Sequence, residues 1–129
     1  MIDTDTGAFR RAVEAHDFEA AIETLAPDVV FRSPVVYKPY DGRDVVAMIL
    51  RAVSEVFEDF RYTSDVEQGD RRAMQFEARI GDRDVEGVDL LRFNADGSVA
   101  ELTVMVRPMS GMQALGDAMR RKLEAAGAA

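Results

Sequence analysis

The sequence contains no cysteine and only one histidine, His16, among its 129 residues. The absence of cysteine excludes disulfides, thiolate metal ligands and a cysteine nucleophile. A single histidine also excludes the multi-histidine sites that many zinc enzymes use. Nothing else in the sequence implies a metal or an organic cofactor, so we expect none.

Positive charge is scarce as well, because 16 lysines and arginines stand against 24 acidic residues and give a net charge of −8. Phosphate groups and anionic lipid headgroups attract basic surfaces, so we expect neither nucleic acid nor a membrane as a partner. The longest apolar run, residues 45–50, is far below the roughly 20 residues that a membrane span needs. The first 15 residues carry several charges and no apolar segment typical of a secretion signal. We therefore expect a soluble, cytoplasmic protein.

What the sequence does contain is the balance of a globular domain, with 47% hydrophobic and 31% charged residues. Its length is that of one ordinary domain, and we expect a single domain over residues 1–129. Apolar residues at helical spacing predict two short helices between residues 9 and 25, joined by a tight corner at residues 15–17. A third helix is expected to open at Asp41-Gly42 and to end before Asp59.

Strand signals fill most of the remaining chain. A short strand is expected at residues 28–32, followed by a loop over residues 35–41. From Phe60 onward the apolar period changes to two, and turns with glycine predict four long strands in an antiparallel meander. After residue 107 a terminal helix is expected, with an apolar stripe of Met112, Leu115, Met119 and Leu123. Helices followed by a meander are typical of an α+β fold, and a strongly curved sheet around helices leaves a hollow.

Residues 85–93 form the most informative strand. One face carries Val85, Gly87, Asp89, Leu91 and Phe93, and the other carries Glu86, Val88, Leu90 and Arg92. The second face has the two charged residues, so we expect the first to point inward. Asp89 is then a carboxyl on an apolar wall, and burial raises its pKa so that it can stand neutral as a hydrogen-bond donor. The alternative is that Asp89 pairs with an arginine or with backbone groups, and the pattern alone does not choose.

One segment resembles a strand, turn and strand of ketosteroid isomerases, which belong to the nuclear transport factor 2-like and SnoaL-like superfamily. That segment is Gly87-Val88-Asp89-Leu90-Leu91-Arg92-Phe93-Asn94-Ala95-Asp96-Gly97-Ser98-Val99. Three further segments match that layout: Ala15-His16-Asp17, Phe31-Arg32-Ser33-Pro34 and Gly42-Arg43. The resemblance spans about residues 9–107. It implies a cone-shaped, curved antiparallel sheet wrapped around three N-terminal helices, with an apolar cavity between them. It also implies a homodimer through the outer face of the sheet.

The resemblance carries one functional residue over clearly. Ketosteroid isomerases use a tyrosine and a protonated aspartate as an oxyanion hole and a second aspartate as the base. Asp89 aligns with the protonated aspartate, whereas the tyrosine position is Phe9 and the base position is Ser33. Phe9 cannot donate a hydrogen bond, and Ser33 is a poor base near neutral pH. SnoaL-like cyclases, by the same resemblance, use one acidic residue in a similar cavity as acid and base.

These observations give a set of candidate site residues. The candidate catalytic residues are Asp89, Tyr37 and Tyr40, although the two loop tyrosines are more often packing residues. The expected ligand-binding residues, all apolar or small, are Phe9, Ser33, Phe57, Phe76, Leu91, Phe93 and Val104. We expect His16 to lie away from any ligand and Arg43 to be a surface charge.

Two functions fit the sequence. The first is a small cavity protein that binds a hydrophobic carbonyl or hydroxyl compound, steroid- or polyketide-like, with or without turnover as a cofactor-free isomerase, cyclase or hydrolase. The second is a non-catalytic ligand-binding or dimeric interaction module. An open cavity of roughly 300 Å³ or more favours a ligand, and a hollow filled by its own side chains favours the interaction module.

Overall fold

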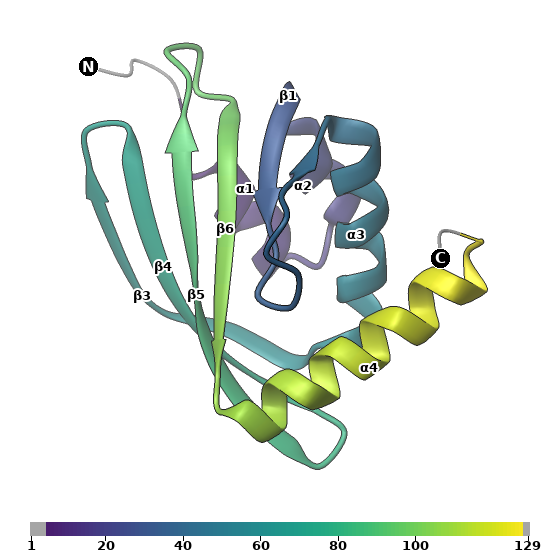
Figure 1. The fold of residues 1–129 in the computed structure, drawn as a ribbon. Helices are drawn as coiled ribbons and strands as arrows, with labels where there is room; N and C mark the ends of the chain where they lie inside the picture. The colour runs from purple at the N-terminus through teal and green to yellow at the C-terminus, as the bar shows by residue number, and fades with distance from the viewer. Residues whose placement is uncertain (1–4, 128–129) are drawn as a thin grey trace.

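A computed structural model describes residues 5–127, which form one six-stranded sheet with helices packed on one of its faces (Figure 1). The helices are α1 (Ala8–Glu14), α2 (Phe18–Glu23), α3 (Arg43–Val56) and α4 (Met109–Ala125). The strands are β1 (Leu25–Arg32), β2 (Tyr40–Asp41), β3 (Glu58–Gln68), β4 (Arg71–Ile80), β5 (Arg83–Phe93) and β6 (Val99–Arg107). The predicted α+β architecture, with three N-terminal helices and one C-terminal helix, is confirmed.

The sheet has the strand order β2-β1-β6-β5-β4-β3. The predicted antiparallel meander is confirmed for β3 to β6, whose short connections permit only antiparallel pairing. The sheet as a whole is mixed, because β1 pairs with β6 in parallel and with β2 in antiparallel orientation. A parallel pair needs a long crossover, and the many residues between β1 and β6 supply it.

The N-terminal helices cover the concave face of the sheet (Figure 1). Asp17 begins α2 as predicted, since its side chain accepts a hydrogen bond from the Ala20 amide at 3.1 Å. Gly42 precedes α3 with a φ of 98°, a conformation that glycine adopts without strain. Val46 and Leu50 are buried on the α3 face that meets the core.

Arg43, in the first turn of α3, corrects one expectation. Its side chain is half-buried, and its Nε donates a hydrogen bond to the Leu25 carbonyl at 3.0 Å, with a second bond from Nη2 to the same oxygen. Arg43 therefore links α3 to β1 through hydrogen bonds and is not a surface charge. The sequence pattern shows that a helix starts here, but it does not show which carbonyl lies within reach.

Helix α4 leaves the end of β6 and crosses the open side of the sheet below α3 (Figure 1). Leu115 of its predicted apolar stripe is buried in a second core cluster that includes Val56 and Val85. Gly111 permits this approach, because a Cβ there would lie 2.3 Å from Val85 Cγ1. Helix α4 thus becomes a wall of the space between the sheet and the helices. Across residues 5–127, none of the helices has the length and apolar character needed to cross a membrane.

Candidate functional site

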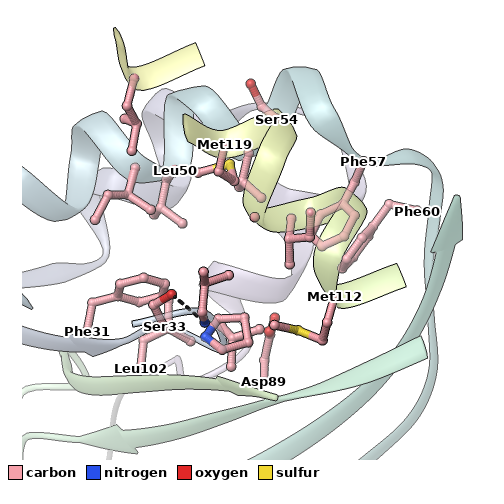
Figure 2. A pocket seen from close by; sticks show the side chains of 18 of the residues that line it. Phe31, Ser33, Leu50, Ser54, Phe57, Phe60, Asp89, Leu102, Met112 and Met119 are labelled. Atoms are coloured by element: carbon pink, nitrogen blue, oxygen red, sulfur yellow. Dashed lines mark hydrogen bonds between the residues drawn. The ribbon is translucent and has the colours of Figure 1, made fainter. Parts of the chain in front are cut away.

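A cavity of about 1070 Å³ lies between the concave face of the sheet and the helices. Figure 2 shows Leu50, Ser54 and Met119 on the helical side, facing Phe31, Ser33, Leu102 and Asp89 on the sheet side, with Phe57 and Phe60 at one end. Most of its wall is apolar. The volume far exceeds the roughly 300 Å³ that separates a ligand site from a filled hollow.

Asp89 lies on the sheet wall of this cavity. The alternation predicted for β5 is confirmed, because Val85, Asp89 and Leu91 are buried while Val88 and Leu90 are only half-buried. Asp89 is 7% exposed and is the one buried charged residue in the part of the chain that the structure describes. A buried carboxyl group therefore faces a mostly apolar space.

Tyr62 is the hydrogen-bond partner of Asp89. The Tyr62 hydroxyl donates to Asp89 Oδ2 at 2.7 Å, and both side chains line the cavity. This contact answers the question that the sequence left open, because the partner is a neutral phenol rather than an arginine or the backbone. The Tyr62 ring packs edge-on against Phe60, with ring centroids 5.0 Å apart. The Phe60 ring therefore supports the Tyr62 ring from one side.

Burial controls the acidity of both groups. Desolvation raises the pKa of Asp89 to about 7, while the hydrogen bond from Tyr62 acts in the opposite sense and is the smaller effect. Burial, followed by the nearby Asp89 charge, raises the pKa of Tyr62 well above its usual range. Near neutral pH, Asp89 is therefore present in both its protonated and its ionised form. A carboxyl poised in this way can donate a proton, accept one, or hydrogen-bond to an oxygen in either role.

The structure brings together some of the predicted site residues and not others. Six of them line the cavity: Phe9, Ser33, Tyr40, Phe57, Asp89 and Val104. Tyr37 lies outside it with a fully exposed side chain, because the loop turns that residue toward solvent. Phe76, Leu91 and Phe93 also lie outside it, buried in the core cluster behind the wall. Phe76, for example, stacks on Phe60 with centroids 4.8 Å apart.

Two cavity residues differ from what the sequence suggested. Tyr62 is not among the candidate residues above, although it shares one face of a predicted strand with Phe60. That shared face is the signal that points Tyr62 inward. His16 lines the cavity instead of lying away from it. Its backbone has a φ of 56°, and its ring packs edge-on against Phe18 at 5.2 Å. The tight corner between α1 and α2 therefore turns this histidine to the rim.

Ser33, at the position where ketosteroid isomerases carry their base, has a local structural role. Its Oγ accepts hydrogen bonds from the backbone amides of Val35 at 3.0 Å and Val36 at 3.4 Å. These bonds shape the loop that borders the cavity. Phe9, at the tyrosine position, supplies an apolar wall and no hydrogen bond. Within residues 5–127, no group of three or more acidic or histidine side chains is placed to hold a metal ion.

Comparison with known proteins agrees with this fold. The sequence profile of the SnoaL-like domain matches residues 7–102. A steroid delta-isomerase from Pseudomonas aeruginosa is 41% identical, with a TM-score of 0.91 over 99% of this chain and 98% of that one. A protein with a cystatin-like fold from Silicibacter pomeroyi is 34% identical, with a TM-score of 0.89 over 96% of this chain and 89% of that one.

A more distant likeness concerns the fold alone. A de novo designed protein with a curved β-sheet is 13% identical, with a TM-score of 0.70 over 88% of this chain and 96% of that one. Among curated protein sequences, none matches the chain.

Proposed function

The chain belongs to the SnoaL-like domain family, and on that premise we propose that it binds a hydrophobic compound of steroid or polyketide size through a carbonyl or hydroxyl oxygen held at Asp89. The observation that carries the proposal is the Tyr62–Asp89 hydrogen bond on the wall of a large apolar cavity. An apolar space with a few convergent polar groups and a carboxyl of raised pKa is the usual form of a small-molecule site.

The chemistry of Asp89 supports an oxygen-bearing ligand. In its protonated form the carboxyl donates a hydrogen bond to a ligand carbonyl, and in its ionised form it accepts one from a ligand hydroxyl. Tyr62 occupies Oδ2, which leaves the second oxygen for the ligand. The apolar walls, including Phe57 and Leu102, would cover the hydrocarbon part. The cavity volume of about 1070 Å³ is at the upper end of the range for small-molecule sites, which supports a polycyclic ligand over a small one.

The pH dependence of ligand binding tests this proposal. The probe is a steroid-sized ketone, compared with the same hydrocarbon skeleton lacking the oxygen, and binding is measured by displacement of a fluorescent apolar dye. If the protonated carboxyl donates to the ketone, affinity falls about tenfold from about pH 6 to about pH 8, because the pKa of Asp89 is about 7. The Asp89→Asn variant carries an amide donor at every pH, so its affinity should not change over that range.

A matched control for this test is Glu101→Gln, which changes a carboxyl on the outer face of the same sheet and should bind the ketone as the wild type does. Equal binding of the ketone and the bare skeleton would contradict the proposal, and so would a wild-type affinity that does not change with pH.

An isomerase is the first enzyme activity to test. The Pseudomonas aeruginosa relative is called a steroid delta-isomerase. Isomerisation needs a donor at the carbonyl oxygen and a group that moves a proton between two carbons. Asp89 with Tyr62 supplies the donor, while Ser33 is not a base. We therefore propose that any turnover depends on Asp89, whose carboxyl would act both as the acid and as the base that moves the proton. A cyclase or a hydrolase that uses the same carboxyl is the other candidate.

Turnover is tested separately from binding. A steroid-sized ketone with an unconjugated double bond is incubated with the protein, and the ultraviolet absorbance of the conjugated product is followed. We expect Asp89→Asn to lower the rate by about a hundredfold, the usual size of a general acid–base contribution. An unchanged rate in that variant would mean that Asp89 takes no part in the reaction. Binding of the ketone without any conversion would mean that the protein binds its ligand without catalysis.

A second proposal concerns the outer face of the sheet, which we propose as a homodimer interface. Met105 is 55% exposed there, beside half-buried Val88 and Leu90. Cross-strand ion pairs border this apolar centre, for example Arg92 with Glu101 at 2.5 Å. Apolar centres with polar rims are typical of protein interfaces. Sedimentation should give a dimer for the wild type and a monomer for Met105→Glu, whereas a monomeric wild type would contradict this proposal.

A further inference from the structure

Arg10 of α1 lies against the ring of Tyr62. Its guanidinium carbon is 5.5 Å from the centroid of that ring, which is within the range of a cation–π contact. Tyr62 in turn donates its hydroxyl to Asp89 at 2.7 Å. A guanidinium group, a phenol and a buried carboxyl therefore follow one another from the helix surface to the cavity wall.

The guanidinium is held in place by acidic neighbours on two elements. Arg10 Nη1 donates to Asp65 Oδ2 of β3 at 2.6 Å, and its Nη2 donates to Glu14 Oε2 of α1 at 3.2 Å. Asp65 also accepts two hydrogen bonds of 2.7 Å from Arg72 of β4. An irregularity in the β3 ladder after Tyr62 breaks the strict alternation, and Asp65 follows as the next partly buried residue of the strand. The result is a partly buried network of fixed geometry behind the phenol ring.

We propose that Arg10 is a positioning residue of the site, whose guanidinium, fixed by Glu14 and Asp65, holds and polarises the Tyr62 ring so that its hydroxyl stays directed at Asp89. The inference deepens the proposed function and rests on it. Arg10 does not line the cavity, so it acts through Tyr62 and not by contact with a ligand.

The physical basis is the response of a phenol to a cation over its ring. A positive charge on the ring face draws electron density from the hydroxyl, which becomes a stronger donor. Arg10 lowers the pKa of Tyr62, whereas Glu14 and Asp89 raise it. A stronger donor stabilises the ionised form of Asp89 and so opposes the effect of its burial.

The other charged groups of the network are Asp65, Arg72 and Glu67, and Arg72 pairs with both carboxylates. Directly opposite Asp89 in the sheet, Met74 of β4 and Val104 of β6 carry no charge. Removal of the Arg10 charge should therefore raise the pKa of Asp89, and most of the rise should depend on the Tyr62 hydroxyl.

A double-mutant cycle tests the inference without a ligand. The pKa of the Asp89 carboxyl is measured by carbon NMR in the wild type, Arg10→Met, Tyr62→Phe and the double variant, with the signal assigned by Asp89→Asn. We expect Arg10→Met to raise the pKa by about half a pH unit in the wild-type background. In the Tyr62→Phe background the same change should move the pKa by less than about 0.2 unit. A merely structural role for Arg10 would not produce this dependence on a single hydroxyl.

Arg11 offers the matched control, because it is the next residue of α1, is exposed, and pairs with Asp5. Arg11→Met should leave the Asp89 titration unchanged. Arg10→Lys keeps a positive charge and should return the pKa most of the way to the wild-type value, which guards against misfolding of the methionine variant.

Two outcomes overturn the inference. One is an Asp89 pKa that does not change in Arg10→Met. The other is an equal change in the wild-type and Tyr62→Phe backgrounds, which would mean that the Arg10 charge acts on Asp89 directly and not through the Tyr62 hydroxyl. Failure of the proposed function would give a different result. In that case Tyr62→Phe would leave the Asp89 pKa unchanged, or the Asp89 pKa of the wild type would be near 4.

Discussion

Two carboxyl groups on neighbouring strands of the sheet are in opposite states. Asp89 of β5 points inward and Glu101 of β6 lies on the outer face. Glu101 accepts hydrogen bonds from Arg92 at 2.5 Å and from Arg32, and these cations hold its pKa below the usual range. Asp89 has a phenol as its partner and is buried, so its pKa is raised to about 7.

The comparison shows that the two faces of one sheet use the same chemical group for different purposes. On the outer face, cations compensate the carboxylate, and exposed pairs of this kind contribute little to the free energy of unfolding. On the inner face, the neutral Tyr62 hydroxyl hydrogen-bonds to one oxygen of Asp89 and leaves the carboxylate charge uncompensated. Burial of that charge lowers the free energy of unfolding, but it also provides a carboxyl of raised pKa for a binding or catalytic site. The difference lies in burial and in the charge of the partner, not in the backbone.

The largest expected effect concerns Asp89 and pH. The folded protein keeps the Asp89 proton up to about pH 7, whereas the unfolded chain releases it near 3.8. The folded state therefore binds more protons between these values, and the free energy of unfolding falls as pH rises from about 4 to about 7. The full difference corresponds to about 4 kcal/mol. Asp89→Asn removes this loss, so urea unfolding should show the variant gaining about 4 kcal/mol on the wild type over that range.

The Asn side chain suits this test because its oxygen still accepts the hydrogen bond from Tyr62. A constant difference between variant and wild type from about pH 4 to about pH 8 would mean that the buried carboxyl has an ordinary pKa, and the contrast between the two faces would fail.

Adjacent leucines of β5 sharpen the comparison in terms of packing. Leu91 is 3% exposed in the core, while Leu90 is half-buried on the outer face. Leu91→Ala should lower the free energy of unfolding by about 3 kcal/mol, because it removes contacts and leaves a cavity. Leu90→Ala should cost less than about 1 kcal/mol at protein concentrations where the chain is monomeric. Equal costs in denaturant titrations would contradict the assignment of the two faces.

The smallest expected effect belongs to Glu101. Its pKa is lowered in the folded state, so its contribution to stability is present above the unfolded value of about 4.5 and is lost as pH falls through the folded pKa. Glu101→Gln should therefore destabilise the protein near neutral pH, by less than about 1 kcal/mol, and this effect should disappear as the pH falls below the folded pKa of Glu101. This sign is opposite to that of Asp89→Asn, and the same urea titrations measure both.

Local periodicity was enough to predict the helices, the four long strands and the inward face of β5. It did not predict the short strand β2, which lies where a loop was expected, or the start of β1 at Leu25. Alternation places Asp89 between Gly87 and Leu91, and it does so regardless of which strands lie beside β5. The turns with glycine likewise predict the antiparallel meander, because short connections allow no other pairing.

Contacts between residues far apart in the chain were not predictable in the same way. Tyr62 lies 27 residues from Asp89, and their meeting depends on the register of β3, β4 and β5 together. The parallel pairing of β1 with β6 depends on the whole intervening chain. His16 reaches the cavity through a left-handed backbone conformation that no periodicity indicates.

The measurement that tests the central claim most directly is the pKa of the Asp89 carboxyl in the wild-type protein, taken from its carbon chemical shift against pH and assigned with Asp89→Asn. Burial beside a neutral tyrosine predicts a value of about 7. A value at or below the usual aspartate figure of about 3.9 would mean a solvated or ion-paired carboxylate. That result would contradict both the contrast between the two faces of the sheet and the proposed role of Asp89 in holding a ligand oxygen.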